Sequence, residues 1–240
     1  MGYAAVLSNF ITTFVGSLCG VMFTYVTQNI AIHDDKEAAQ LTASSITQMI
    51  VVLLPISILT IMNSKDIVSI VFGRGKFDER AINNCSKALI GYGLVFVPFI
   101  VRELLSRLQY AYGESKRPMI NSSLAIAINI VLSLILSQFL GVLGVTIATS
   151  ISVVFCAAFN YSSSKKYNKH VKIITDNKSI IDMIIGSVLC IIISLINKLL
   201  LVNINQLVRF IITCGISLSL YLVINQNSIK MLINSLKKKK

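Results

Sequence analysis

The sequence predicts an all-α integral membrane protein with about seven transmembrane helices. Of its 240 residues, 55% are hydrophobic and only 13% are charged, whereas soluble domains contain roughly 25% charged residues. A soluble fold of this length has no core large enough to bury so much apolar surface. The apolar residues also form long runs that reach the about 20 residues of a membrane-spanning helix, without the alternation of barrel strands. These runs are residues 3–31, 41–63, 81–112, 118–139, 141–163, 179–201 and 205–226.

The runs fall into two groups separated by a basic segment. Residues 1–165 hold five runs and are expected to form one bundle, in which segment 64–78 lies at the membrane interface because it is too short to span. Residues 166–178 form the predicted cytoplasmic linker. Residues 179–226 supply two more helices, dominated by Ile, Leu and Val, that suit a surface facing lipid. Residues 227–240 form a predicted basic cytoplasmic tail.

The first three runs carry features that predict how their helices pack. Run 3–31 contains Ser, Thr and Gln, which favour either an internal position in the bundle or hydrogen bonds to the carbonyls of the same helix. Pro55 and Pro98 lie inside the second and third runs. Each proline removes one backbone hydrogen bond and is predicted to kink its helix.

Membrane topology explains the net charge of +12 better than nucleic acid binding does. If the helices alternate across the bilayer, one side receives thirteen Lys and Arg residues and the other receives seven. The richer side is expected to be cytoplasmic, which places the C-terminus inside and the N-terminus outside. No nucleic acid partner is expected, and the tail Lys237 to Lys240 is expected to contact anionic lipid.

Neither an enzyme active site nor a metal site is predicted. The five cysteines stand singly in apolar runs and are expected to be small buried residues. His33 and His170 lie in separate loops, and Asp34 and Asp35 are followed by Lys36, as in a solvated turn. Chemistry on a lipid-linked substrate would need a base or a carboxylate cluster. We therefore expect no catalytic residue, no metal and no cofactor.

Arg102, Glu103 and Arg107 are the candidate substrate-binding residues, because they lie in the third apolar run. Ionisable side chains are costly inside a bilayer and indicate a functional site by default. We expect the two guanidinium groups to face a hydrated hollow and to donate paired hydrogen bonds to an anionic lipid headgroup, with Lys116 and Arg117 at the cytoplasmic mouth. In the structural alternative, Arg102 and Glu103 pair with neighbouring helices and Arg107 anchors its helix at the interface.

A glycine-rich basic loop follows the second run and contains Gly73, Arg74, Gly75, Lys76 and Phe77. Glycine permits the backbone conformations of a tight turn, and a phenylalanine can anchor such a turn at the membrane interface. We interpret the loop as a structural turn that orients two helices. Direct contact with the headgroup is the alternative.

The loop and the residues that close the third run resemble a known family. The matching residues are Val71-Phe72-Gly73-Arg74-Gly75-Lys76-Phe77, Leu105-Ser106-Arg107, Tyr110-Ala111, Gly113-Glu114, Lys116-Arg117-Pro118, Asn129 and the stretch 141–150. Over about residues 1–165 this pattern resembles the MurJ/MviN family of lipid II flippases, in the superfamily of multidrug, oligosaccharidyl-lipid and polysaccharide exporters.

The resemblance implies a protein of the bacterial cytoplasmic membrane that flips a polyprenyl-pyrophosphate-linked cell-wall precursor, lipid II, by alternating access. The chain looks like helices eight to fourteen of the family plan, which are the second lobe and the last two helices. In that plan the lobes enclose a cationic cavity for the headgroup, and the last two helices form a groove for the polyprenyl tail. The implied partners are the lipid substrate, membrane lipids and a missing N-terminal half.

Three departures from the family pattern keep other functions open. The pattern commonly carries a charged pair in the eighth helix, whereas uncharged residues follow Tyr3-Ala4 here. Gln109 stands where an aromatic residue is usual, and Glu114 replaces an aspartate. Two alternatives therefore remain beside lipid II flipping: export of another polyprenyl-linked precursor, of the O-antigen or teichoic type, or an inactive truncated remnant.

Overall fold

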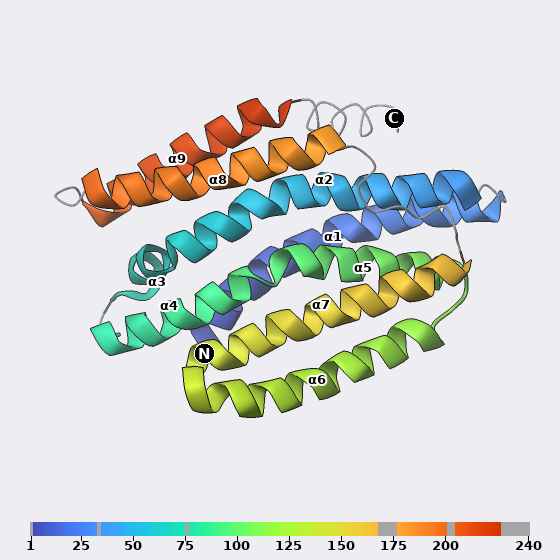
Figure 1. Cartoon of the computed structure of the whole chain (residues 1–240), viewed down its shortest axis with the longest axis horizontal. Coiled ribbons are helices and arrows are strands. Elements are labelled where there is room, and N and C mark those ends of the chain that lie inside the picture. The colour runs from blue at the N-terminus through green and yellow to red at the C-terminus, as the bar shows by residue number, and fades with distance from the viewer. Residues whose placement is uncertain (1, 33–34, 75–76, 168–176, 201–204, 227–240) are drawn as a thin grey trace.

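The computed structural model describes residues 2–32, 35–74, 77–167, 177–200 and 205–226, and the regular structure within these ranges is helical. Figure 1 shows the long helices running side by side along one axis. The helices are α1 (Gly2–Ala31), α2 (Asp35–Met62), α3 (Ser64–Phe72), α4 (Glu79–Gly93), α5 (Phe96–Ala111), α6 (Lys116–Leu140), α7 (Val142–Tyr167), α8 (Asn177–Leu200) and α9 (Gln206–Ile224).

Six of these helices, α1, α2, α6, α7, α8 and α9, are long and apolar enough to cross a membrane. Together, α4 and α5 pass the same test as a single span that is bent by 43°. The prediction of an all-α membrane protein with about seven spans is therefore confirmed.

The third predicted run, 81–112, is broken into α4 and α5 at residues 94–95. At the break, the Gly93 carbonyl accepts a hydrogen bond from the Ser57 hydroxyl of α2. A Cβ atom on Gly93 would lie 2.7 Å from a side-chain carbon of α2, so the two helices meet closely here. The kink predicted from Pro98 is observed. Proline offers no N–H to the carbonyl four residues earlier and its ring clashes with that carbonyl, and residue 94, four positions before Pro98, lies at this break.

The helices stack in layers, with α5 near the centre (Figure 1). On one side α8 and α9 pack against each other and against α2, while α6 packs against α7 on the opposite side. Ile100, Leu105 and Leu108 of α5 are buried in the core. Pro55 lies inside α2, and the kink expected there stays a prediction. Successive long helices run in opposite directions, as consecutive membrane spans do.

Most of α1 is exposed in this chain. Only 18% of its most apolar window is buried, and Asn9, Thr13 and Ser17 are exposed. Hydroxyl groups donate to carbonyls within the helix, from Thr12 to Ser8 at 3.2 Å and from Ser17 to Thr13 at 3.1 Å. Of the two explanations offered for these polar residues, the contacts within this chain support hydrogen bonding inside the helix.

The structure describes only some of the segments into which the sequence analysis divided the chain. Segment 64–78 contains the nine-residue helix α3, and its place relative to the membrane stays a prediction. Residues 168–176 of the predicted linker and the whole predicted tail 227–240 lie outside the described residues.

Candidate functional site

The candidate site is centred on three side chains of α5, Arg102, Glu103 and Arg107, which we call the arginine cluster. One turn of helix separates Glu103 from Arg107, and the Arg107 Nη2 and Nε atoms lie 2.9 Å and 3.1 Å from Glu103 Oε1. The Arg102 Nη2 atom lies 3.4 Å from Glu103 Oε2. Glu103 therefore pairs with both arginines of its own helix, rather than with a neighbouring helix as the structural alternative supposed.

The arginine cluster is half-buried and carries a net positive charge. The exposed fractions of the side chains of Arg102, Glu103 and Arg107 are 31%, 22% and 26%. Arg107 Nη2 also lies 3.4 Å from the Gly16 carbonyl oxygen of α1, and the Arg102 guanidinium lies 5.1 Å from the centroid of the Phe99 ring. Two guanidinium groups thus share one carboxylate.

Arg102 lines a hollow of about 230 Å³ between α5, α6 and α7. Polar side chains from the other two helices share its wall: Ser122, Asn129, Thr149 and Ser152. Arg107 is not among the lining residues and instead contacts α1. The structure therefore separates the two arginines, with Arg102 beside the hollow and Arg107 at the α1–α5 contact.

Lys116 and Arg117 lie at the start of α6 with exposed side chains. Their backbone N–H groups both donate to Glu114 Oε1, at 3.0 Å and 3.2 Å. Glu114 thereby satisfies two of the backbone donors that every helix leaves open at its N-terminus. Gly113 has a φ of 75°, a conformation that favours glycine, so it shapes the turn between α5 and α6.

The other predicted motif residues occupy different surroundings. Tyr110 is 48% exposed at the end of α5, and Pro118 is buried in the first turn of α6. Asn129 lies in the hollow described above, where its Oδ1 accepts a hydrogen bond from the Ser133 hydroxyl at 3.1 Å. The motif therefore spreads along the α5–α6 hairpin rather than forming one site.

The glycine-rich loop ends α3 and carries an aromatic cluster. The Gly73 N–H donates to the Ser69 carbonyl at 2.8 Å, and a Cβ on Gly73 would lie 2.3 Å from that oxygen. The Tyr3 ring lies 5.0 Å from Phe72 and 5.4 Å from Phe77, between ring centroids. These contacts support the structural interpretation of the loop. Arg74 is exposed, while Gly75 and Lys76 lie outside the described residues.

A buried polar network joining α5, α6 and α7 was missed by the sequence analysis. Gln109 Nε2 donates to the Asn160 carbonyl and to the Ser164 hydroxyl, both at 3.1 Å. Asn160 Nδ2 donates to Ser106 at 2.8 Å, and Asn121 Nδ2 donates to Asn160 Oδ1 at 2.8 Å. The one signal in the sequence was Gln109, which departs from the family pattern.

An ion pair between α3 and α9 was also missed. Arg209 Nη2 and Gln206 Nε2 each lie 2.9 Å from Asp66 Oδ1, and the Ser69 hydroxyl donates to Gln206 Oε1 at 3.2 Å. We call these four residues the Asp66 cluster. No short-range pattern relates residues that are 143 positions apart, so only the fold reveals this contact.

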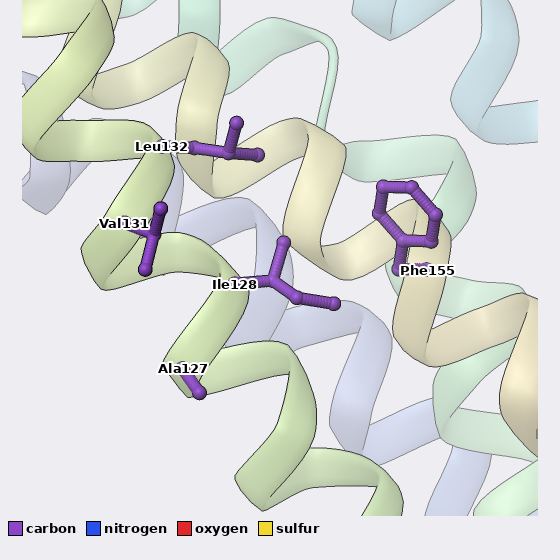
Figure 2. A pocket seen from close by; sticks show the side chains of 5 residues that line it. All are labelled: Ala127, Ile128, Val131, Leu132 and Phe155. Carbon is purple, nitrogen blue, oxygen red and sulfur yellow. The ribbon is translucent and has the colours of Figure 1, made fainter.

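Apolar surface dominates the outer faces of the molecule. Figure 2 shows a hollow between α6 and α7 whose labelled side chains are all apolar, with a volume of about 380 Å³. Large hydrophobic side chains are also exposed along α8 and α9, namely Ile181, Ile184, Ile185, Val188, Ile192, Leu195, Ile196, Leu207, Val208, Ile211 and Ile216. Such surfaces suit contact with lipid.

Within the described part of the chain, no group of three or more His, Cys, Asp or Glu side chains could hold a metal ion. The five cysteines are free, and four of them are buried.

Comparison with known proteins adds a family match. A model of the family described as lipid II flippase MurJ matches residues 1–217. A probable lipid II flippase MurJ of Rickettsia prowazekii is 25% identical over 170 residues, covering 70% of this chain and 34% of that protein. The protein of the same description from Thermotoga maritima is 35% identical over 111 residues, covering 45% and 23%.

A solved structure gives the same fold. A lipid II flippase MurJ in an inward closed conformation superimposes with a TM-score of 0.74 at 22% identity, covering 96% of this chain and 48% of that chain. The present chain therefore spans about half the length of the solved chain, and the aligned parts cover about a third or less of those two relatives.

Proposed function

The chain belongs to the MurJ family of lipid II flippases, and from that premise we propose that it is part of a flippase for a polyprenyl-pyrophosphate-linked cell-wall precursor. The substrate would be lipid II, moved across the bacterial cytoplasmic membrane by alternating access. Residues 1–165 would supply the second lobe and residues 179–226 the last two helices. The role is transport rather than catalysis.

The observation that carries this proposal is the position of Arg102. Arg102 lines a hollow whose wall combines polar residues with apolar ones, between helices that are otherwise apolar. Charge at such a place is costly unless it serves a pathway or a partner. A planar guanidinium matches the oxygen atoms of a phosphate better than a lysine ammonium does, so the pyrophosphate is the part of the substrate that Arg102 would bind.

The apolar surfaces of α8 and α9 support a role in holding the polyprenyl tail. These two helices pack on α2, apart from the hollow between α5, α6 and α7 (Figure 1). A long isoprenoid chain needs contact with hydrocarbon side chains, which both helices expose. The headgroup of the lipid would then bind between α5, α6 and α7, and its tail would bind along α8 and α9.

The exposed polar side chains of α1 support a partner that completes the transporter. Asn9 and Thr13 are exposed on a helix apolar enough to span a membrane, and polar side chains in a span usually face protein or a wet cavity rather than lipid. The chain also covers only 48% of the solved flippase. A first lobe, in the same polypeptide or in a second one, would cover this face.

The proposed orientation follows from charge. If the long helices alternate across the bilayer, thirteen Lys and Arg residues of the sequence would lie on one side and seven on the other. The positive-inside tendency then places the C-terminus in the cytoplasm.

Binding of lipid II to the full 240-residue chain in phosphatidylcholine nanodiscs tests the proposal. We expect fluorescent lipid II to bind, and Arg102→Ala to weaken this binding by about tenfold, the size of one lost hydrogen bond to a charged group. Arg80→Ala is the matched control, because Arg80 is exposed on α4 and lies outside the proposed site.

Three outcomes would count against lipid II as the substrate. If undecaprenol, which lacks phosphate, binds as tightly as lipid II, the proposed binding of pyrophosphate by Arg102 is wrong. Tighter binding of an undecaprenyl-pyrophosphate oligosaccharide would favour an exporter of another precursor. Binding of none of these lipids would favour an inactive remnant.

A further inference from the structure

We propose that Glu103 is an internal competitor of the substrate pyrophosphate. It holds the Arg102 and Arg107 guanidinium groups while the site is empty, and it yields them when the headgroup enters. This inference rests on the proposed function, because it names how the same site is regulated.

The first argument is the geometry of the Arg107 pair. Glu103 Oε1 accepts a hydrogen bond from Arg107 Nε at 3.1 Å, and Arg107 Nη2 lies 2.9 Å from the same oxygen as an ion pair. One edge of the guanidinium, the Nε–Nη2 edge, thus already faces a negative oxygen, and this edge is one that a phosphate oxygen could also use. The Glu103 carboxylate therefore occupies the position that a pyrophosphate oxygen would need in order to bind this edge of Arg107.

The second argument is the charge balance. Among the described residues, Glu103 is the one carboxylate within 4.0 Å of a nitrogen of either arginine. One negative charge for two positive charges lowers the cost of holding guanidinium groups in a membrane span, yet it leaves an excess positive charge. An anion with two or more negative charges can therefore neutralise the cluster more fully than Glu103 does.

The third argument is that Arg107 makes closer contacts within the protein than Arg102 does. Arg107 is fixed from two directions, by Glu103 and by the Gly16 carbonyl of α1. The Arg102–Glu103 contact is longer, at 3.4 Å, and Arg102 also lines the hollow. A guanidinium has five N–H donors, so Arg102 can reach an anion in the hollow before Glu103 leaves Arg107.

Competition of this kind suits a transporter, which must release what it binds. A carboxylate that returns to the arginines as the headgroup leaves would speed release, whereas two unopposed guanidinium groups would retain the anion. A purely structural Glu103 would instead stabilise the helix without changing the affinity for anions.

The test is titration of inorganic pyrophosphate by calorimetry against the full chain in phosphatidylcholine nanodiscs. We expect Glu103→Gln to bind pyrophosphate about tenfold more tightly than the wild-type chain, the size of one competing charged hydrogen bond. Glu103→Asp keeps the competing charge and should stay within about threefold of wild type. Glu79→Gln is the matched control, because Glu79 is an exposed carboxylate at the start of α4, and it should have no effect.

The outcomes distinguish failure of this inference from failure of the proposed function. If the wild-type chain binds pyrophosphate and Glu103→Gln binds it equally or more weakly, Glu103 is not a competitor while the anion site stands. If lipid II binds but pyrophosphate binds to neither form, the competitor model is also wrong. If neither lipid II nor pyrophosphate binds, the proposed function fails together with this inference.

A second measurement covers the case in which Glu103→Gln does not fold. Infrared difference spectra of the wild-type chain, with glutamate carboxyl groups labelled with carbon-13, should show a shifted carboxylate band when pyrophosphate binds. If pyrophosphate binds and the glutamate bands do not change, Glu103 does not release the arginines and the competitor model is wrong.

Discussion

The arginine cluster and the Asp66 cluster are two ionic groups that differ in charge balance and in the helices that contribute their partners. In the Asp66 cluster one carboxylate meets one arginine, and Asp66 and Arg209 are 8% and 20% exposed. Its partners come from α3 and α9, so it ties distant parts of the chain together. In the arginine cluster one carboxylate serves two arginines of the same helix, α5, and a hollow adjoins it.

This difference in charge balance and in reach separates a structural contact from the proposed binding site. A balanced buried pair between two helices leaves no charge for a ligand and becomes costly when one partner is removed. An unbalanced group whose ion pairs stay within one helix ties no second helix through those pairs, and it keeps positive charge available. The predictions below test this separation through the free energy of unfolding.

Asp66→Ala should have the largest effect on stability. It leaves Arg209 without its carboxylate in a mostly buried place, and we expect the free energy of unfolding to fall by about 3 kcal/mol. Unfolding by sodium dodecyl sulfate in mixed micelles measures this change. The double variant Asp66→Ala with Arg209→Met, which removes the unpaired charge, should recover part of the loss; no recovery would show that charge is not the cause.

Gln109→Ala should have the next largest effect. Gln109 is 0% exposed and donates to two acceptors on α7, so its loss should cost about 2 kcal/mol of unfolding free energy. The same micelle titration measures it, with the exposed Gln138→Ala of α6 as control. Equal values for the two variants would show that the network does not hold α5 against α7.

Gln206→Ala should cost about 1 kcal/mol, as expected for one net hydrogen bond. Asp66 keeps its ion pair with Arg209 in this variant, so the loss should be smaller than in Asp66→Ala. Unfolding of the single variants and of the double variant gives the coupling energy between residues 66 and 206. A coupling near zero would show that Gln206 does not support the pair.

Arg102→Ala should have the smallest effect, with a change in unfolding free energy below about 1 kcal/mol. Glu103 keeps its closer pair with Arg107 when Arg102 is removed. The same unfolding assay, run beside the lipid II binding assay, separates stability from function. If Arg102→Ala lowers the unfolding free energy as much as Asp66→Ala does, the arginine cluster is a structural contact like the Asp66 cluster, and the contrast between the two clusters is wrong.

Local features of the sequence were sufficient to select the candidate site residues. Arg102, Glu103 and Arg107 stand out because ionisable residues are rare in an apolar run, and this signal needs no knowledge of the fold. Their partners were harder to predict. The i,i+4 spacing of Glu103 and Arg107 was present in the sequence, but whether either side chain turns to its own helix, to α1 or to a hollow depends on the neighbouring helices.

The sequence by itself determined the class of protein, the number of spans and the family resemblance, because hydrophobicity and motif spacing are properties of short stretches. The tertiary structure alone decided the Asp66–Arg209 pair and the Gln109 network. Each of these depends on contacts between residues far apart in the chain, such as Gln109 with Asn160. Local periodicity carries no information on which distant backbone or side-chain groups will meet.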